Sequence, residues 1–427
     1  VADSTQAACG GAATADEYWM RRALVLAQQS LTLSNPNPRV GCVIVGAAGQ
    51  LLAQGYTQAA GGLHAEAQAL AQAAAQNIDV RGASLYVTLE PCSHFGRTPP
   101  CVDAIVQAGI GRVIAVVEDP NPQVAGQGYV RLCAAGIALT QGVLAAEARA
   151  LNIGFFSRMQ RRQPWLRLKM ATSLDGFIAL PNGTSQWITS DAARVDGQAW
   201  RARACAVLTG VGTVVADDPL LNVRVGEPAR QPHLLLLDSQ LRTPPTARLL
   251  DAADTRQIHI FTCQPQAAAA TALQARGAHI HPMPATPQGR VELAAVMAFL
   301  ASELPCNELH IEAGAHINGA FLQANLVDEV LHYQAPKLLG QGLPAAQLPL
   351  LENLGFNVIS EQTHDLTLAG LDGHERRVIL HDMELKQRDG LEINLAKLSP
   401  MLEEAFLAAW HGEVDDDALN RLILTGG

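Results

Sequence analysis

One small set of residues constrains this 427-residue chain more than any other: His64-Ala65-Glu66, Pro91-Cys92 and Cys101. An imidazole and two thiolates form a ligand set that suits zinc, and three protein ligands would leave a fourth position for water. Such a metal activates water at neutral pH, and Glu66 could carry protons beside it. In an ideal helix, positions i and i+2 point about 200° apart. Both His64 and Glu66 can therefore serve one metal only near a helix end, and the preceding Gly61-Gly62 predicts such an end.

The motif resembles the zinc-deaminase signature H-x-E…P-C-x-x-C, with one departure. Eight residues, 93–100, separate the two cysteines where the signature has two. The stretch from Pro91 to Cys101 closely resembles the deaminase half of the bifunctional riboflavin biosynthesis deaminase-reductases. An alternative is a closed zinc site that only staples a loop, with His94 as the nearest fourth ligand. Glu66 would have no role in such a site.

Composition limits the possible partners and the cellular location. The formal net charge is −10, without the basic excess of a nucleic-acid-binding protein. The one cationic cluster, 158–167, is expected to be a solvated linker at a domain boundary. Eight irregularly spaced cysteines do not resemble a secreted disulfide framework. With no long apolar run and no basic and apolar blocks in residues 1–15, we expect a cytoplasmic protein that contacts neither membrane nor nucleic acid, and a disordered start.

The pattern of apolar runs predicts an α/β fold in two halves. In the first half, strands are expected at 40–45, 85–89 and 112–117, and helices at 18–30, around His64, at 101–109 and at 124–135. In the second half, strands are expected at 166–170, 206–209, 234–238, 258–262 and 309–311. Strands that alternate with helices indicate sheets covered on both faces. The boundary between the halves is expected near 158–164.

The second half carries chemistry of its own. Residues 312–320 follow a strand and open a helix, and 209–213 form a similar turn. Glycines at such turns allow backbone amides to approach a phosphate at the helix N-terminus, although turns of this kind are common. Arg201 and Arg224 could each bind a phosphate through two hydrogen bonds. The alternative for both is that they are exposed surface arginines.

From about residue 17 to residue 385, the chain resembles the riboflavin biosynthesis deaminase-reductases. The motifs that carry this resemblance are 35–41, 64–66, 92–101, 173–176, 185–189, 216–219 and 312–314. The resemblance implies a cytidine-deaminase-like three-layer domain, then a dihydrofolate-reductase-like α/β domain, with a helical C-terminal extension. We expect a disordered arm at 1–15, a zinc-dependent deaminase domain at 16–160, an NADPH-dependent reductase domain at 161–386 and the extension at 387–427.

The resemblance also implies the activity. The substrate would be 2,5-diamino-6-ribosylamino-4(3H)-pyrimidinone 5′-phosphate, which loses its 2-amino group by zinc-dependent hydrolysis. NADPH would then reduce the ribosyl group to a ribityl chain. Family members are oligomeric, so a homo-oligomer, a dimer or a tetramer, is expected. The sequence itself does not reveal what would favour NADPH over NADH.

Individual roles follow from the same resemblance, position by position. His64, Cys92 and Cys101 match zinc ligands, and Glu66 matches the proton shuttle. Residues that match substrate contacts are Asn37, Ser185, Arg201, Leu221, Arg224 and Glu312, with Asn37 in the deaminase site. Residues that match cofactor-lining positions are Ala171, Trp187, Thr213, Asp217, Ser239, Gly314, Ala315, His316, Ile317, Asn318, Gly319 and Ala320.

Several alternatives stay open at this point. A zinc deaminase acting on a nucleic-acid base or a free nucleoside would share the metal chemistry, but it would leave the second half unexplained. A non-catalytic zinc scaffold would leave Glu66 unexplained. In the reductase step, the proton could come from Lys169, Asp175, Glu312 or water.

The end of the chain is predicted from its local pattern. A strand is expected at 377–380, extending to 385. Ser399 can cap a following helix whose apolar stripe includes Leu402, Phe406 and Trp410, and a shorter helix would follow Asp415. An isolated helix of this length is marginal in water, so the stripe needs a surface to cover. That surface could belong to the same chain or to a neighbouring subunit.

Overall fold

The computed structural model describes residues 14–95, 99–122, 124–185, 188–226, 230–335, 337–348, 357–362, 365–369 and 375–380. They fall into two compact units: Val1–Leu168 with Gly197–Glu329 and Ala346–Pro349, and Lys169–Asp196 with Val330–Ala345 and Leu350–Gly427. Among the described helices, none is both long and apolar enough to cross a bilayer. The predicted extension at 387–427, residues 1–13 of the predicted N-terminal arm and the strand continuation at 381–385 lie outside the described residues. Residues 14 and 15 of that arm are described, and there Thr14 caps the helix that begins at Ala15.

A five-stranded sheet, in the order β2-β1-β3-β4-β5, forms the middle layer of one part of the first unit. Its strands are β1 (Gly41–Val45), β2 (Leu51–Tyr56), β3 (Ser84–Val87), β4 (Arg112–Ala115) and β5 (Ala138–Gln141). β1 is antiparallel to β2 and to β3, whereas β3, β4 and β5 run parallel. β1, which lies between β2 and β3, is buried along its whole length, as the apolar run predicts.

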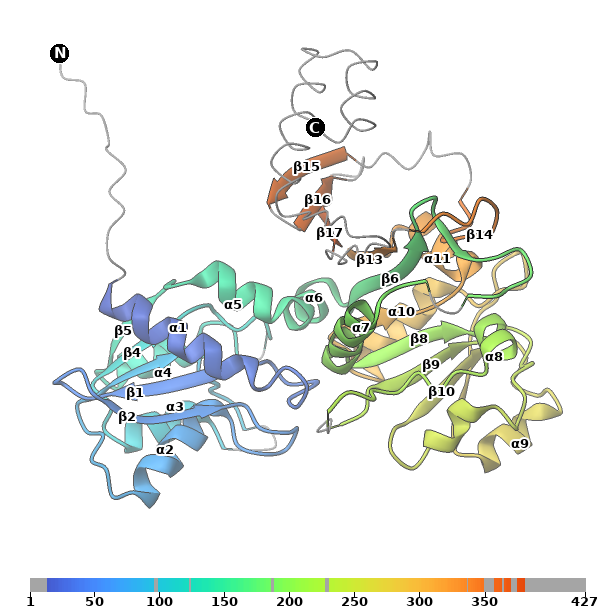
Figure 1. Cartoon of the computed structure of the whole chain (residues 1–427). Helices are drawn as coiled ribbons and strands as arrows, with labels where there is room; N and C mark the ends of the chain where they lie inside the picture. The colour runs from blue at the N-terminus through green and yellow to red at the C-terminus, as the bar shows by residue number, and fades with distance from the viewer. Residues whose placement is uncertain are drawn as a thin grey trace, which may run out of the picture. The chain divides into compact units, whose positions relative to one another are not determined.

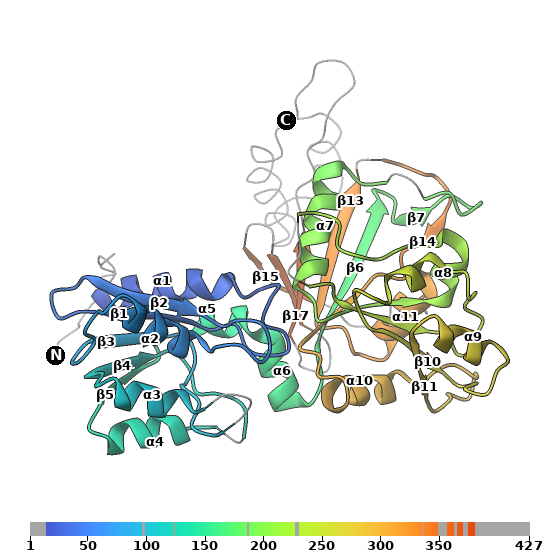
Figure 2. The ribbon, with the colours of Figure 1, turned by 90° about the horizontal axis from the view of Figure 1, so that it is seen from below.

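Helices cover both faces of this sheet. They are α1 (Ala15–Gln28), α2 (Ala65–Ala75), α3 (Cys101–Gln107), α4 (Gln127–Ala134), α5 (Ala145–Leu151) and α6 (Ile153–Arg161). Figure 1 shows α1 and α5 on one face and α2 and α3 on the other. α4 packs beside α3 and β5, so three layers enclose one apolar core (Figure 2).

A parallel sheet forms the other part of the first unit, with neighbours in the order β11-β10-β9-β8-β12-β6. Its strands are β8 (Ala206–Gly210), β9 (His233–Leu237), β10 (Ile258–Thr262), β11 (Ala278–Pro282), β12 (Glu308–Ile311) and the start of β6 (Trp165–Ser173). From Lys169 onward, β6 belongs to the second unit. β8, β10 and β12 are buried throughout, which is typical of a parallel sheet covered on both faces.

The helices of this part are α7 (Asp191–Arg203), α8 (Val211–Asp217), α9 (Ala269–Ala275), α10 (Leu293–Ser302) and α11 (Ala315–Gln323), with a 3₁₀ helix at Arg248–Ala252. Val214 of α8 and Leu273 of α9 share an apolar core with Leu234 and Leu236 of β9. Phe299 of α10 packs against Phe261 of β10 with ring centroids 5.5 Å apart.

The second unit contains most of β13 (Glu329–Ala335), with β17 (Glu375–Leu380), β16 (Asp365–Ala369) and β15 (Asn357–Gln362) as successive neighbours. The last three strands are antiparallel. A separate pair joins β7 (Phe177–Ala179) to β14 (Leu343–Pro344). β17 contains the strand predicted at 377–380.

The prediction that the cationic cluster at 158–167 is a solvated linker is wrong in part. α6 occupies 153–161, and β6 begins at Trp165, so little more than a turn separates the two elements. Arg167, from the cationic cluster, is 1% exposed and is the largest of the fully buried side chains. It pairs with Glu308 and Glu329, which compensates its buried charge.

Candidate functional site

Three predicted ligands of the first half come together in space. His64 is the N-cap residue of α2 and has extended backbone dihedral angles, so it lies outside the helical spacing that would turn it away from Glu66. This is the helix end that the sequence predicts. Cys92 lies five residues after the end of β3, and Cys101 is the first residue of α3. The ligand atoms of the three residues lie within 4.8 Å of one another.

The spacing of these atoms fits zinc. Zinc bonds of about 2.3 Å to sulfur and about 2.0 Å to nitrogen place S and N roughly 3.6 Å apart in a tetrahedral site. The Sγ atoms of Cys92 and Cys101 lie 3.5 and 3.4 Å from Nδ1 of His64. Across the described part of the chain, His64, Cys92 and Cys101 form the one ligand group of this kind, and His94 is not in it. The geometry therefore favours an open three-ligand site over a closed one.

Glu66 lies in the first turn of α2, is 4% exposed and shares a hydrogen bond with the Cys101 thiol. Burial, followed by the negative charge of Cys92, raises the pKa of Glu66 to about 7. The hydrogen bond from Cys101 lowers the pKa of Cys92 to about 4, and the same hydrogen bond, together with burial, raises the pKa of Cys101. A carboxyl group with a pKa near neutrality can both accept and release a proton.

Sequence reasoning missed two acidic residues beside this site. Buried Glu90, just before Pro91-Cys92, accepts backbone hydrogen bonds from Asp119, Gly126 and Gly128 at 2.8–3.1 Å. It thereby fixes the loop that faces the cysteines. Burial raises the pKa of Asp119 to about 7, and the charges of Cys92 and Glu66 add to the effect. The only sequence signal was an acidic residue at the end of an apolar strand.

The two glycine turns of the second half lie side by side at the carboxyl edge of the parallel sheet. β8 leads into α8 through Gly210, and β12 leads towards α11 through Gly314, which caps it. β8 and β12 are hydrogen-bonded neighbours. A Cβ atom at Gly210 would lie 2.1 Å from Cδ1 of Ile317, so the Ile317 side chain of α11 packs directly over this glycine. Two helix N-termini therefore open at one edge, where an anion can bind.

Arg201 and Glu312 form a bidentate ion pair at the same edge, with N–O distances of 2.6 and 2.8 Å. The third guanidinium nitrogen of Arg201 donates to the carbonyl of Asn222 at 2.7 Å. This guanidinium group is therefore already satisfied by protein, and its bidentate binding of a phosphate stays a prediction. Arg224 is exposed, and its backbone is fixed by Gln198 at 2.9 Å, so it is the better placed of the two arginines.

Two further residues support this edge and were missed from the sequence. Arg256 donates to the carbonyls of Leu220 and, at 2.7 Å, Leu221, which holds the loop between α8 and Arg224. Leu221 itself is buried with φ of 50°. Buried His310 places Nε2 3.5 Å from the Glu312 carboxylate.

The remaining predicted residues divide between the two units. Thr213 and Asp217 lie on α8, Ser239 follows β9 and accepts a hydrogen bond from Val291 at 3.0 Å, and 314–320 begin α11. Gly319 has a packing reason of its own, because a Cβ atom there would lie 2.0 Å from the Gln347 carbonyl oxygen. Ala171 and Ser185 belong to the second unit, and Trp187 lies outside the described residues. The Asn37 backbone is held by Ser34 in the loop before β1.

Two of the four possible proton donors are ionised acceptors. The carboxylate of Asp175 accepts from Ser173, Leu339 and Gly340, and the Ser173 hydrogen bond is the largest cause of its lowered pKa. Although burial opposes ionisation of Glu312, the charge of Arg201 holds its pKa well below the ordinary value. Lys169 and water remain.

The fold and the sites together define a zinc-dependent deaminase joined to a reductase. The sequence matches the cytidine and deoxycytidylate deaminase zinc-binding region over residues 13–117 and the RibD C-terminal domain over 164–368. It also matches the ACT3 domain of glutamate dehydrogenase over 343–398.

Whole-chain relatives agree with this division. The riboflavin biosynthesis protein RibD of Escherichia coli is 44% identical over 350 residues, which cover 79% of this chain and 93% of that protein. RibD of Aquifex aeolicus is 39% identical, covering 81% and 97%. The structure of Acinetobacter baumannii RibD superposes with a TM-score of 0.73 at 39% identity, covering 83% of this chain and 98% of that one.

The chain belongs to the RibD family of riboflavin biosynthesis proteins. It combines a cytidine-deaminase-like domain with a dihydrofolate-reductase-like domain. It is accordingly a bifunctional enzyme, a hydrolase and an oxidoreductase, that uses zinc in its deaminase half and NADPH in its reductase half.

Proposed function

We propose that the substrate is 2,5-diamino-6-ribosylamino-4(3H)-pyrimidinone 5′-phosphate and that the product is 5-amino-6-ribitylaminouracil 5′-phosphate. Support comes from a Thermotoga maritima structure described as a diaminohydroxyphosphoribosylaminopyrimidine deaminase/5-amino-6-(5-phosphoribosylamino)uracil reductase. It is 31% identical, with a TM-score of 0.72, covering 83% of this chain and 97% of that one. The observation that carries the proposal is the grouping of His64, Cys92 and Cys101 beside buried Glu66.

In the deaminase half, His64, Cys92 and Cys101 hold the metal, which when bound activates a water molecule for attack on the ring carbon that bears the amine. The Glu66 carboxylate accepts a proton from that water and delivers it to the leaving amine. Its pKa of about 7 suits both transfers. Asn37 contacts the pyrimidine from the loop before β1.

The reductase half would hold NADPH, which when bound would supply the hydride that reduces the ribosyl group. Arg224 binds the phosphate, while Arg201 and Glu312 hold the sugar with Leu221 and Ser185. The residues that would hold the cofactor are Ala171, Trp187, Thr213, Asp217, Ser239 and 314–320. Lys169 or a water molecule protonates the opening sugar, because Asp175 and Glu312 are ionised acceptors.

The domain limits follow the same division: an arm at 1–15, the deaminase domain at 16–160, the reductase domain at 161–386 and a helical extension at 387–427. We place the enzyme in the cytoplasm as a homo-oligomeric dimer or tetramer. If the extension clamps subunits together, a chain that ends at Gln387 will form a smaller assembly in light scattering and keep both activities. An unchanged mass would contradict that role.

The decisive experiment supplies purified enzyme with the diaminopyrimidinone phosphate and NADPH. Ammonia release should be followed by an equal loss of NADPH absorbance, whereas NADH at the same concentration should give a slower second step. Ammonia release from cytidine but not from the phosphorylated pyrimidinone would instead identify a nucleoside deaminase. Faster reduction with NADH would overturn the cofactor preference.

A further inference from the structure

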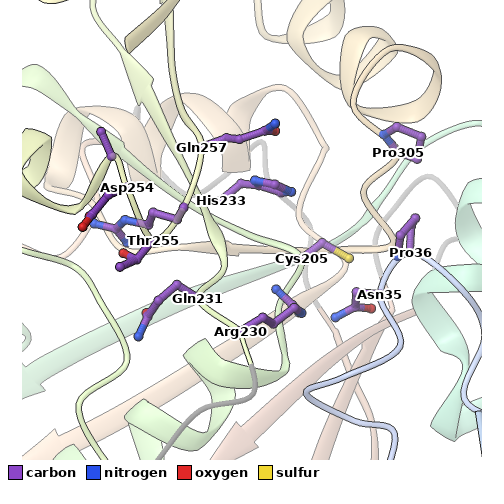
Figure 3. A pocket seen from close by; sticks show the side chains of 12 residues that line it. Asn35, Pro36, Cys205, Arg230, Gln231, His233, Asp254, Thr255, Gln257 and Pro305 are labelled. Carbon is purple, nitrogen blue, oxygen red and sulfur yellow. The ribbon is translucent and has the colours of Figure 1, made fainter. Parts of the chain in front are cut away.

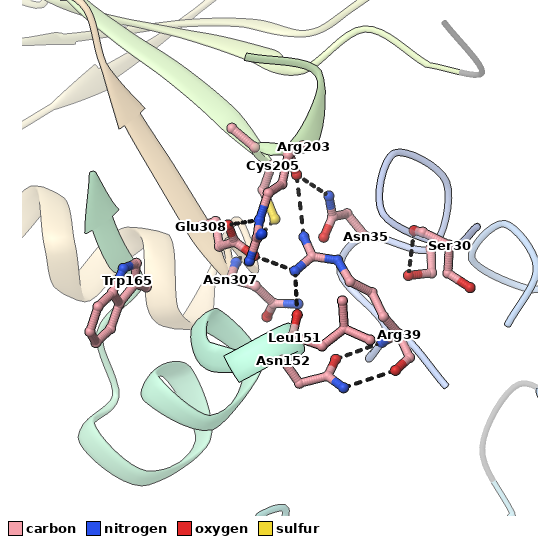
Figure 4. A network of polar contacts seen from close by, with 12 residues as sticks. Ser30, Asn35, Arg39, Leu151, Asn152, Trp165, Arg203, Cys205, Asn307 and Glu308 are labelled. Carbon is pink, nitrogen blue, oxygen red and sulfur yellow. Dashed lines mark hydrogen bonds and ion pairs between the residues drawn. The ribbon is translucent and has the colours of Figure 1, made fainter. Parts of the chain in front are cut away.

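The loop that precedes β1 belongs to the deaminase half, yet its polar partners lie in the reductase half and in α6. Asn35 donates to the carbonyl of Arg203 at 3.1 Å. The carbonyl of Pro36 accepts from Asn307 at 2.8 Å, and Arg39 pairs with Glu308 of β12. Figure 4 shows Asn35 and Arg39 of the deaminase half pointing towards Arg203 and Glu308 of the reductase half.

Glu308 is the centre of this network. It is fully buried and binds three guanidinium groups, those of Arg39, of Arg203 at 2.7 Å and of Arg167 at 3.1 Å. Arg167 also pairs with Glu329 at 2.8 Å. The cluster therefore holds three buried or nearly buried positive charges against two buried negative ones. Such a cluster permits little movement, because any displaced charge would lose its partner where water cannot replace it.

Packing alone does not hold the loop. A cavity of about 400 Å³ lies behind it, with Asn35 and Pro36 on one side and Cys205, Arg230 and His233 on the other (Figure 3). With empty volume on that side, the loop is located chiefly by its hydrogen bonds and ion pair. Arg39 carries most of them, since Asn152 also binds its backbone N–H and C=O at 2.7 and 2.8 Å.

From Arg39 the connection to the deaminase site is short. Two residues later, Gly41 exchanges hydrogen bonds with Thr88, whose strand leads to Cys92. The next residue, Cys42, is fully buried in the core of the deaminase half. On the other side of Arg39, two residues earlier, lies Asn37.

We propose that Arg39 and Glu308 are a positioning pair through which the reductase half sets the deaminase active-site loop. The pair touches neither substrate nor metal. It holds Asn37 and the start of β1 where Asn37 can contact the pyrimidine. Deamination therefore depends on the carboxylate of Glu308, which belongs to the reductase half. The inference rests on the proposed contact between Asn37 and the pyrimidine.

The test uses Arg39→Met in the full chain. This substitution removes only the guanidinium group that comes from the deaminase half. It leaves two arginines facing two glutamates, so the charges of the cluster become balanced and no carboxylate is left without a partner. We expect zinc to remain at one per chain, the deaminase KM to rise about tenfold with little change in kcat, and reduction of the deaminated intermediate to continue. Arg39→Lys keeps the charge and should restore part of the loss.

Arg112→Met is the matched control, because Arg112 pairs at 2.7 Å with Asp16 inside the deaminase half. It should leave the deaminase KM unchanged. An unchanged KM in Arg39→Met, or equal loss of zinc and both activities in Arg39→Met and Arg39→Lys, overturns the positioning role. Asn37→Ala separates the proposed substrate contact from the proposed positioning role. If the deaminase KM rises in Asn37→Ala but not in Arg39→Met, the substrate contact of Asn37 is retained and the positioning role of Arg39 and Glu308 is refuted.

Discussion

Gly55 of β2 offers a direct test of how the scaffold positions the metal ligands. A Cβ atom at this position would lie 2.4 Å from the Ala65 carbonyl oxygen and 2.7 Å from the Ala69 nitrogen. Both atoms belong to the first turns of α2, the helix that begins at His64 and carries Glu66. Gly55→Ala should therefore push the start of this helix away from the sheet.

The size of the effect follows from the distances. Real Cβ contacts stay above 3.0 Å, so a contact of 2.4 Å requires a shift of at least 3.0 − 2.4 = 0.6 Å. Overpacking of this kind costs about 1–3 kcal/mol. A metal site tolerates misplacement of about 0.5 Å, and lost ligand support typically lowers metal affinity by about 10–100-fold. We expect zinc affinity and deamination to fall together.

Zinc affinity is measured by competition with a chromophoric chelator, and deamination by ammonia release. Gly212→Ala is the control, since a Cβ atom at Gly212 in α8 would meet no atom within 4 Å. It should leave zinc binding unchanged. If Gly55→Ala binds zinc within about twofold of the parent chain, contact between β2 and α2 does not set the ligand geometry, and the reasoning is refuted.

Three further predictions concern single side chains. Glu66→Gln should keep the zinc and lose deamination by at least ~100-fold, with reduction of supplied intermediate intact; normal ammonia release would contradict the proton-shuttle role. Arg201→Ala should lower kcat/KM for reduction by about 100-fold or more, because it strands the Glu312 carboxylate, while ammonia release continues; loss of both activities would point to unfolding. His259 has a pKa lowered to about 3 by burial and by neighbouring imidazoles including His281, so only the unfolded chain binds its proton near pH 6.5 and stability should fall as pH drops below that value. Urea midpoints at pH 7 and pH 5 should differ less in His259→Phe than in the parent chain; an equal difference would contradict this account.

The zinc site could be predicted from the sequence because its information is local. Gly61-Gly62 marks a helix start, and that start places His64 and Glu66 on one side of the ligand group. The parallel strands β8, β9 and β10 were equally accessible, since a sheet covered on both faces requires continuous apolar runs. β2 was missed because its residues Leu51–Tyr56 show neither a continuous apolar run nor strict alternation.

The buried charges could not be predicted because their meaning lies in pairs far apart in the chain. Arg39 and Glu308 are 269 residues apart, and in a linear reading each is an ordinary surface charge. Arg167 was assigned to a solvated linker for the same reason, although it is sandwiched between Glu308, Glu329 and the ring of Trp200 at 4.2 Å. Burial of three arginines is tolerated only when carboxylates from other strands are buried beside them. The pairing of these charges therefore becomes visible only in the folded sheet. Apolar packing is not directional, so many arrangements satisfy it about equally well. A buried ion-pair cluster such as that of Arg39 and Glu308 is satisfied only when each charge meets its own partner, and it therefore specifies one arrangement of the contacting strands and loop.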